Sequence, residues 1–220
     1  PGFQQKPALA VLPVGSVNVL ARELNLPRTL EAAAHVAGDG APRPIDVGLL
    51  QGRPFLLMAG IGFDAATIDS VKLRNKRRFG ALAYVLEGLK KILSYPDRGF
   101  TVCCDGQEVS FRAWQIVVAN STLYTYRWRI VPQAKIDDGE LHVFALHSGS
   151  VLSRAGQVLG IISNRAAATN ITYLKGRRLR FSMDRPTEFQ MDGDYCFTSE
   201  TAEVEILPKA LNIMVQADKS

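Results

Sequence analysis

Residues 11–27, VLPVGSVNVLARELNLP, decide the fold of the N-terminal part of this chain. An apolar run over residues 8–14 stops at Gly15 and Ser16, and a segment with helical spacing follows from Asn18 until Pro27. Backbone N–H groups at the start of a helix are unpaired, and the helix dipole favours an anion there. A strand, a tight turn and a helix start in this order therefore suggest a phosphate site.

The composition is that of an ordinary globular protein, with 220 residues, 47% hydrophobic and 21% charged. No apolar run approaches the roughly 20 residues that a membrane span needs. Three cysteines cannot form a fully paired disulfide framework, which favours a reducing, cytosolic setting. The net charge of +5 is clustered in residues 72–78 and 175–180. Such clusters attract polyanions or an anionic membrane face, although a solvated surface explains them equally well.

The order of the predicted elements indicates two parts. Helices are expected over residues 18–24 and 30–36, and the turn-rich run 37–44 marks a boundary. Beyond it, short strands are expected, interrupted by helices over 79–93 and 151–162; these strands cover 45–50, 53–59, 101–105, 109–119, 140–146, 179–183 and 203–207. The pattern is a piece of α/β fold followed by a mainly antiparallel β domain. The first strand, 8–14, has no predecessor, so we expect the chain to be the later part of something longer.

Two acidic glycine turns stand out, Asp137-Asp138-Gly139 and Asp192-Gly193-Asp194. Asp-Gly favours a hairpin turn for backbone reasons alone, while a carboxylate in such a turn can also bind a hard cation or accept a proton. The segment 60–65 has two glycines after a strand and is interpreted as a tight turn. The three histidines form no evident constellation. From the residues alone, the reaction stays unnamed.

Five sequence blocks in order carry a family resemblance: residues 12–24, 59–65, 79–93, 117–143 and 191–195. Together they resemble the bacterial diacylglycerol kinase-like lipid kinases, which are related to sphingosine kinases and NAD kinases. The resemblance implies an α+β fold, in which residues 1–42 are the remnant of an α/β nucleotide-binding domain. Residues 43–215 would form the β-sandwich lipid kinase domain, and 216–220 a tail. The family's GGDGT loop is absent from this sequence, so we expect this chain alone to be inactive.

The resemblance also assigns candidate residues to ATP and Mg²⁺. The turn at Gly15, Ser16 and Asn18 matches the family's GTxN element, in which the hydroxyl residue contacts ATP. Residues 135–140 match a turn that binds a structural Mg²⁺. Asp138 would supply the carboxylate, and Lys135 and Glu140 would supply backbone carbonyls, a ligand set that suits a hard, hydrated cation.

The Asp192-Gly193-Asp194 turn matches the family's DGE, whose final acid is the proposed proton acceptor. Asp194 would take the proton from the lipid hydroxyl during attack on the γ-phosphate. Its side chain is about one methylene shorter than the family's glutamate. Asp192 is the second catalytic candidate, either orienting Asp194 or bridging to a metal.

The expected function is ATP-dependent phosphorylation of a lipid hydroxyl, with diacylglycerol as the default acceptor. One alternative keeps the chemistry but changes the acceptor to a sphingoid base or phosphatidylglycerol. Another is a non-catalytic lipid- or partner-binding module. The expected partners are ATP and an anionic membrane surface, without nucleic acid, and an exposed cleft face would favour a homodimer. The expected location is the cytoplasm, peripherally on the inner membrane face.

Overall fold

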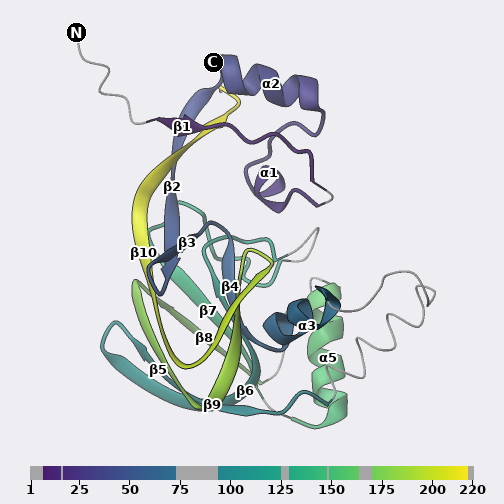
Figure 1. Cartoon of the computed structure of the whole chain (residues 1–220), viewed down its shortest axis with the longest axis vertical. Helices are drawn as coiled ribbons and strands as arrows, with labels where there is room; N and C mark the ends of the chain where they lie inside the picture. The colour runs from purple at the N-terminus through teal and green to yellow at the C-terminus, as the bar shows by residue number, and fades with distance from the viewer. Residues whose placement is uncertain are drawn as a thin grey trace, which may run out of the picture.

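The computed structural model describes residues 7–15, 17–72, 94–124, 129–147, 149–163 and 170–217 (Figure 1). Ser16 and the helix predicted over 79–93 lie outside these residues. The described helices are α1 (Val19–Glu23), α2 (Leu30–Asp39), α3 (Phe63–Lys72) and α5 (Val151–Ile162). The described strands are β1 (Ala8–Leu9), β2 (Ala41–Leu50), β3 (Arg53–Phe55), β4 (Met58–Gly62), β5 (Arg98–Cys104), β6 (Gln107–Ala119), β7 (Leu141–His147), β8 (Ile171–Gly176), β9 (Arg178–Met191) and β10 (Asp194–Val215).

The described strands form one ten-stranded sheet in the order β3-β2-β10-β9-β4-β6-β7-β8. In addition, β5 pairs with β6 and β9, and β1 pairs with β10. The β1–β10 pair is parallel, and the other strand pairs are antiparallel. This arrangement confirms the predicted α+β class with a mainly antiparallel β part. None of the helices in the described part of the chain is long and apolar enough to cross a membrane.

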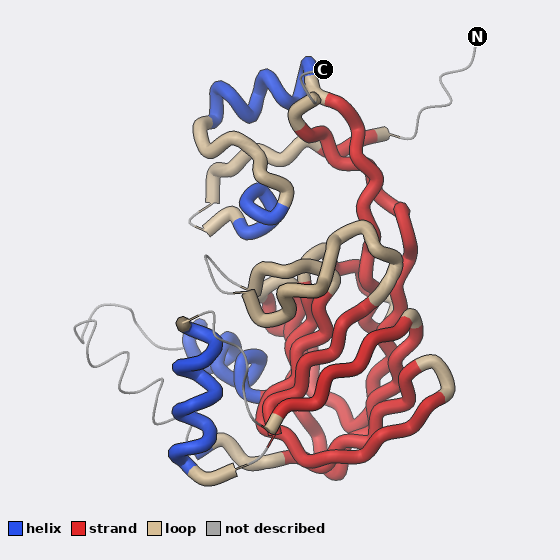
Figure 2. The backbone as a smooth tube through the Cα atoms, turned by 180° about the vertical axis from the view of Figure 1, so that it is seen from behind, coloured by secondary structure: helices blue, strands red, loops and turns tan. Residues whose placement is uncertain are grey.

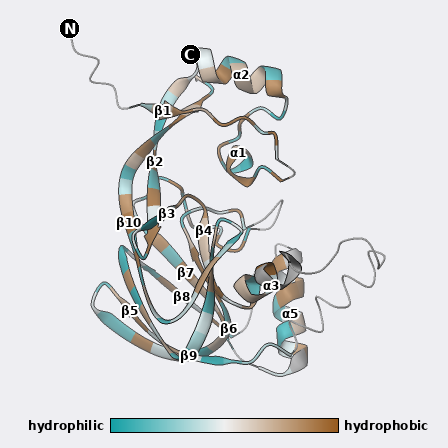
Figure 3. Cartoon of the chain, in the orientation of Figure 1, coloured by the Kyte–Doolittle hydropathy of each residue, from teal (hydrophilic) through white to brown (hydrophobic). Residues whose placement is uncertain are grey.

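Strand β4 is the most enclosed part of the sheet, since all five of its residues are buried. One face of the sheet encloses a core around Ile61, Ile116 and Phe189. The opposite face of β4, β6 and β7 packs a second cluster that includes Trp114 and Ile161, the latter from α5. When a strand is covered on both faces, its sequence is a continuous apolar run rather than an alternation of apolar and polar residues. In Figure 3, β7 and α5 carry many hydrophobic residues, whereas β9 carries more hydrophilic ones.

A smaller unit with α1, α2 and β1 packs around its own apolar cluster at one end of the molecule (Figure 1). Strands β2 and β10 run through both units, and β10 has a bulge between Leu207 and Leu211. The buried carboxylate of Asp46 accepts hydrogen bonds from the N–H groups of Lys209 (2.7 Å) and Gly139 (2.6 Å). These bonds fix the bulge and the loop before β7 to the same residue of β2.

Several boundaries predicted from the sequence are wrong. The first strand covers only Ala8–Leu9, the two residues that pair with β10. Residues 41–44 belong to β2 rather than to a turn; their prolines are tolerated because β3 pairs only with residues 48–50 of β2. The strand predicted over 53–59 divides into β3 and β4. Strand β8 and helix α3 were not predicted.

The glycine turns also differ from one another. Asp192 (φ 48°) and Gly193 (φ 94°) are both left-handed and form the tight hairpin turn between β9 and β10. This is the turn that Asp-Gly favours. Residues 137–139, in contrast, lie in the loop that leads into β7, with no strand before them in the described segment 129–140. The hairpin interpretation of that turn is therefore wrong.

Candidate active site

The β9–β10 hairpin carries the two catalytic candidates, Asp192 and Asp194. The Asp192 carboxylate accepts three backbone hydrogen bonds, from the N–H groups of Leu56 (2.8 Å), Leu57 (2.8 Å) and Met58 (3.0 Å). The Asp192 N–H donates to the carbonyl of Met58 at 3.0 Å. Asp192 thus anchors the hairpin to the bend between β3 and β4. Asp194 is the first residue of β10 and is exposed beside this anchor.

Asp64, in the first turn of α3, lies next to the same hairpin. Its carboxylate accepts hydrogen bonds from Tyr124 Oη (2.9 Å), Gln190 Nε2 (3.0 Å) and its neighbour's N–H, that of Ala65 (2.7 Å). Burial raises the pKa of Asp64, and hydrogen bonding with Gln115, Gln190 and Tyr124 opposes that shift. Burial beside Asp64 likewise raises the pKa of the Tyr124 hydroxyl.

The glycines of the 59–65 segment make room for this arrangement. A side chain at Gly60 would place its Cβ 2.1 Å from Asp64 Oδ2 and 2.5 Å from Gln190 Nε2. Gly62 has a left-handed φ of 108° and lies against the carbonyl of Trp114, which permits the sharp change from β4 to α3. The tight turn predicted over 60–65 is wrong, because β4 runs directly into α3, and this strand–helix junction places Asp64.

The predicted ATP turn is closed by its own asparagine. Asn18 Nδ2 donates to the carbonyls of Pro13 (3.0 Å) and Gly15 (2.7 Å), while its Oδ1 accepts from the Gly15 N–H (2.9 Å). Asn18 itself is left-handed, with φ 51°. Its side chain thus fixes the backbone of Pro13 and Gly15. Helix α1 that follows spans only five residues, so the sequence argument from a helix dipole is weak here.

A hollow of about 400 Å³ opens beside this turn. Among its lining residues are Asn18, Arg22 and Arg28. Two guanidinium groups next to a tight turn suit a phosphate-bearing ligand, because arginine pairs with phosphate through two parallel hydrogen bonds. Ser16, the residue expected to contact ATP directly, lies outside the described residues.

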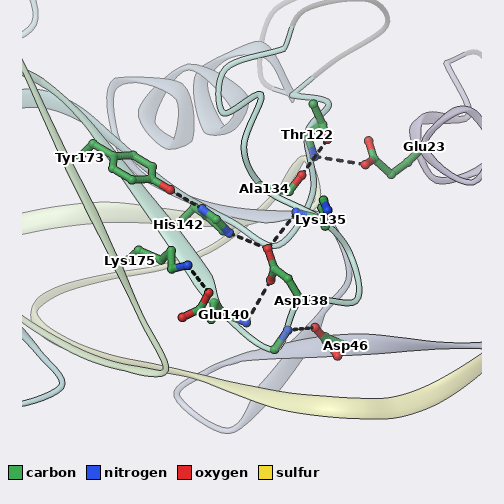
Figure 4. A network of polar contacts seen from close by, with 11 residues as sticks. Glu23, Asp46, Thr122, Ala134, Lys135, Asp138, Glu140, His142, Tyr173 and Lys175 are labelled. Carbon is green, nitrogen blue, oxygen red and sulfur yellow. Dashed lines mark hydrogen bonds and ion pairs between the residues drawn. The ribbon is translucent and has the colours of Figure 1, made fainter.

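The predicted magnesium ligands meet in the loop before β7 (Figure 4). The Asp138 carboxylate accepts from the N–H groups of Lys135 (3.1 Å) and Glu140 (3.1 Å), and lies 2.9 Å from His142 Nε2. His142 is buried, and its Nδ1 lies 2.6 Å from Tyr173 Oη. The Glu140 carboxylate pairs with Lys175. Asp138 is therefore held by protein groups on both of its oxygens.

This geometry fits a magnesium ion only in part. No group of three or more His, Cys, Asp or Glu side chains within the described ranges could hold a metal ion. The predicted set of one carboxylate with backbone carbonyls does not require such a group, but a cation would have to share Asp138 with three existing partners. The magnesium assignment to Asp138, Lys135 and Glu140 stays a prediction.

One carboxylate links α1 to the β domain. Glu23 accepts hydrogen bonds from the N–H groups of Thr122 (3.2 Å) and Leu123 (3.0 Å), the two residues before Tyr124 (Figure 4). Figure 2 shows the loop-rich segment between β6 and β7 lying between the strands and the unit that holds α1 and α2. A chain of contacts thus runs from Glu23 through residues 122–124 to Asp64.

The structure brings some predicted residues together and leaves others apart. Asp192 and Asp194 share one hairpin, Gly15 and Asn18 share one turn, and Asp138 shares a loop with Lys135 and Glu140. The structure also connects to these sites six residues for which the sequence predicted no role: Glu23, Asp46, Asp64, Tyr124, His142 and Gln190. For Asp64 the signal was present, since a carboxylate follows a buried strand with two glycines after a single intervening residue, Phe63.

Two family models match the chain. Residues 2–50 match the diacylglycerol kinase catalytic domain, and residues 58–215 match the YegS C-terminal NAD kinase beta sandwich-like domain. The chain belongs to the diacylglycerol kinase-like lipid kinase family. The YegS model alone covers more than half of the chain, including the Asp138 loop and the Asp192–Asp194 hairpin. The boundary between the two models lies between residues 50 and 58.

Relatives of this lipid kinase family agree with the assignment. A protein of Chromohalobacter salexigens described as "Probable lipid kinase YegS-like" is 30% identical over 94% of this chain and 67% of its own length. The diacylglycerol kinase of Bacillus subtilis is 25% identical over 88% of this chain and 64% of its own length. The chain therefore spans about two thirds of the length of these curated relatives.

A solved structure supports the fold. The crystal structure of a diacylglycerol kinase from Bacillus anthracis str. Sterne superposes with a TM-score of 0.74 at 22% identity. The superposition covers 97% of this chain and 70% of that chain. At this level of identity, the likeness shows that the lipid kinase fold is shared along nearly the whole of the present chain.

Proposed function

We propose that this chain is part of an ATP-dependent lipid kinase that transfers the γ-phosphoryl group to a lipid hydroxyl, with diacylglycerol as the first acceptor to test. The observation that carries the proposal is the β9–β10 hairpin. In a chain of the lipid kinase family, it exposes Asp194 beside Asp192, whose carboxylate is bound by three backbone N–H groups. A carboxylate on such a rigid support suits a general base.

In this mechanism Asp194 takes part in one proton transfer, as the proton acceptor. Its carboxylate accepts the proton of the acceptor hydroxyl while that oxygen bonds to the γ-phosphorus. The bond from this phosphorus to the β–γ bridging oxygen breaks, and ADP leaves. Asp192 keeps the hairpin in place and does not itself exchange a proton in this scheme.

The nucleotide would lie toward the turn at Gly15, Ser16 and Asn18. Two features support this placement. The Asn18 side chain holds the turn through its hydrogen bonds to Pro13 and Gly15, and Arg22 and Arg28 line the hollow beside it. Mg²⁺ bound to the phosphates would neutralise charge that develops during transfer. A separate structural Mg²⁺ at Asp138 belongs to the same proposal. Since this sequence has no GGDGT loop, the 220-residue chain alone should not transfer phosphate.

The direct test is a lipid kinase assay on the product of the complete reading frame, with radiolabelled ATP and mixed micelles of diacylglycerol. Asp194→Ala should lower kcat by about 100-fold or more, because general base catalysis contributes roughly 10²–10⁴-fold. Asp194→Glu restores the carboxylate with a longer reach and should keep substantial activity. Glu200→Gln, an exposed residue of β10, is the matched control.

Near-normal turnover by Asp194→Ala would refute the base assignment. A panel of sphingosine, phosphatidylglycerol and diacylglycerol identifies the acceptor, since the best substrate is the one with the highest kcat/KM. No transfer to any lipid, together with liposome binding in the absence of ATP binding, would instead favour a non-catalytic lipid-binding module.

Access to a lipid acceptor requires contact with a membrane, and we include peripheral binding to an anionic surface in the proposal. On α5, Leu152 and Leu159 are 83% and 65% exposed and lie two turns apart on one helix face. Exposed apolar side chains of this kind suit insertion among lipid headgroups. The basic segment 72–78 would add attraction to anionic lipids.

Flotation with vesicles containing phosphatidylglycerol tests this part. Replacing Leu152 and Leu159 by Ser should reduce the bound fraction several-fold. Leu30→Ser is the matched control, because Leu30 is a 55% exposed leucine on α2 in the other unit. Equal loss of binding in both variants would contradict a specific role for α5.

A further inference from the structure

Gln190 occupies an unusual position between the buried carboxylate of Asp64 and the tip of the candidate catalytic hairpin. It is 2% exposed and lies two residues before Asp192. Its Nε2 donates to Asp64 Oδ2 at 3.0 Å, and its Oε1 accepts from the Gly193 N–H at 2.8 Å. The two ends of one amide therefore join α3 to the peptide group between Asp192 and Gly193, one peptide group before that of Asp194.

The orientation of this amide is determined by its neighbours. The carboxylate of Asp64 accepts hydrogen bonds, so the NH₂ group of Gln190 faces it and the carbonyl oxygen faces Gly193. The opposite orientation would place the NH₂ group against the Gly193 N–H and the amide oxygen against the carboxylate. Both contacts would be repulsive, and a buried unsatisfied polar group costs roughly 1–3 kcal/mol. Asp64 therefore selects a single orientation.

Asp64 is itself fixed from a third direction. Tyr124 Oη donates to Asp64 Oδ2 at 2.9 Å, and Tyr124 directly follows the two residues whose N–H groups bind Glu23 of α1. Gly60 leaves the space in which Asp64 and Gln190 meet, since a Cβ there would overlap both side chains. The hairpin is thus braced by residues from β4, α3, β9 and the β6–β7 loop.

We propose that Gln190, oriented by Asp64, is a positioning residue that sets the direction of the Asp194 carboxylate by holding the Gly193 N–H. This inference rests on the proposed kinase function. The side chain of Gln190 meets neither substrate in this scheme. Its effect comes through the hairpin, and a displacement of about 1 Å at a reacting group can cost on the order of 100-fold in rate.

The test uses the product of the complete reading frame in the lipid kinase assay. Gln190→Leu keeps most of the volume but removes both hydrogen bonds. It should lower kcat between about 10-fold and 100-fold while the KM for ATP changes less than about twofold. Gln107→Leu, at the exposed start of β6, is the matched control and should leave kcat unchanged.

A double variant gives a sharper result, because it exchanges the two groups. Gln190→Glu alone places two carboxylates against each other and should lower kcat as Gln190→Leu does. In the double variant that also carries Asp64→Asn, one oxygen of the new glutamate can still accept from the Gly193 N–H. Its other oxygen can accept from the NH₂ group of the new asparagine. The double variant should regain at least part of the lost kcat. A general packing role predicts no such rescue.

Hydrogen exchange at backbone amides provides a readout that does not depend on turnover. It also reveals poor folding of a variant, because exchange would then be faster throughout the sheet. The Gly193 amide should exchange faster in Gln190→Leu than in the wild type, with other β9 and β10 amides unchanged. If the wild type and Gln190→Leu have the same kcat and the same Gly193 exchange, the positioning role is wrong while the kinase proposal stands. A wild-type product that phosphorylates no lipid would overturn both.

Discussion

Asp192→Ala is the change that most directly tests how the hairpin is held. In the wild type, Oδ1 accepts from the N–H groups of Leu57 and Met58, and Oδ2 accepts from that of Leu56. Alanine leaves three N–H groups without this acceptor. The hairpin edge is solvent-accessible, so water can bond to some of these N–H groups in the variant. Each lost hydrogen bond should therefore lower the free energy of unfolding by about 1 kcal/mol. The expected loss from hydrogen bonding is therefore about 3 kcal/mol.

The backbone adds a smaller contribution. Asp192 has a left-handed φ of 48°. This conformation costs most residues about 1–2 kcal/mol, whereas aspartate, asparagine and glycine adopt it more easily. Asp192→Ala should therefore lower the free energy of unfolding by about 3–4 kcal/mol, and Asp192→Gly by slightly less. Asp192→Asn retains an oxygen that can serve Leu57 and Met58, so its expected loss is about 1–2 kcal/mol.

Urea denaturation of the 220-residue chain measures these differences. The buried Trp114 provides a fluorescence signal, and a loss of 3 kcal/mol corresponds to a shift of about 1 M in the urea midpoint. The order of stability should be wild type, Asn, Gly, Ala. A loss below about 1 kcal/mol for Ala would show that water replaces the carboxylate fully, and the anchoring role of Asp192 would be refuted.

Two further predictions concern the neighbouring network. Gly60→Ala should displace the side chains of Asp64 and Gln190 and destabilise the chain by about 1–3 kcal/mol. Gly38→Ala in α2 is the control in the same denaturation assay and should be neutral or stabilising, because a Cβ at Gly38 would have no atom within 4 Å. Burial raises the pKa of Asp64 above its ordinary value of 3.8, so the folded state binds this proton more tightly than the unfolded state. The contribution of Asp64 to stability should therefore decline as the pH rises from about 4 through the raised pKa. When the free energy of unfolding is measured from pH 4 to 8, it should decline less steeply in Asp64→Asn than in the wild type. Identical pH profiles of the two proteins would contradict the burial argument.

The sequence alone determined the kinds of element and their order for most of the chain. The helix over 151–162 and the strands beginning near 109 and 140 follow from short-range apolar spacing, which the chain carries independently of its partners. The family and the acidic hairpin could also be predicted, because those motifs are contiguous. The limits of β1, β2 and β4 could not, since each depends on which strand lies opposite.

Only the tertiary structure decided how the acidic groups are used. Asp192 and Asp138 look alike in sequence, each next to a glycine, yet one binds the backbone of residues 56–58 and the other lies beside a buried histidine. The link from Asp64 to Gln190 spans 126 positions of the chain, and no local pattern records it. Local spacing fixes elements because it acts between neighbours, whereas hydrogen-bond partners are fixed only when the folded sheet brings distant residues within about 3 Å.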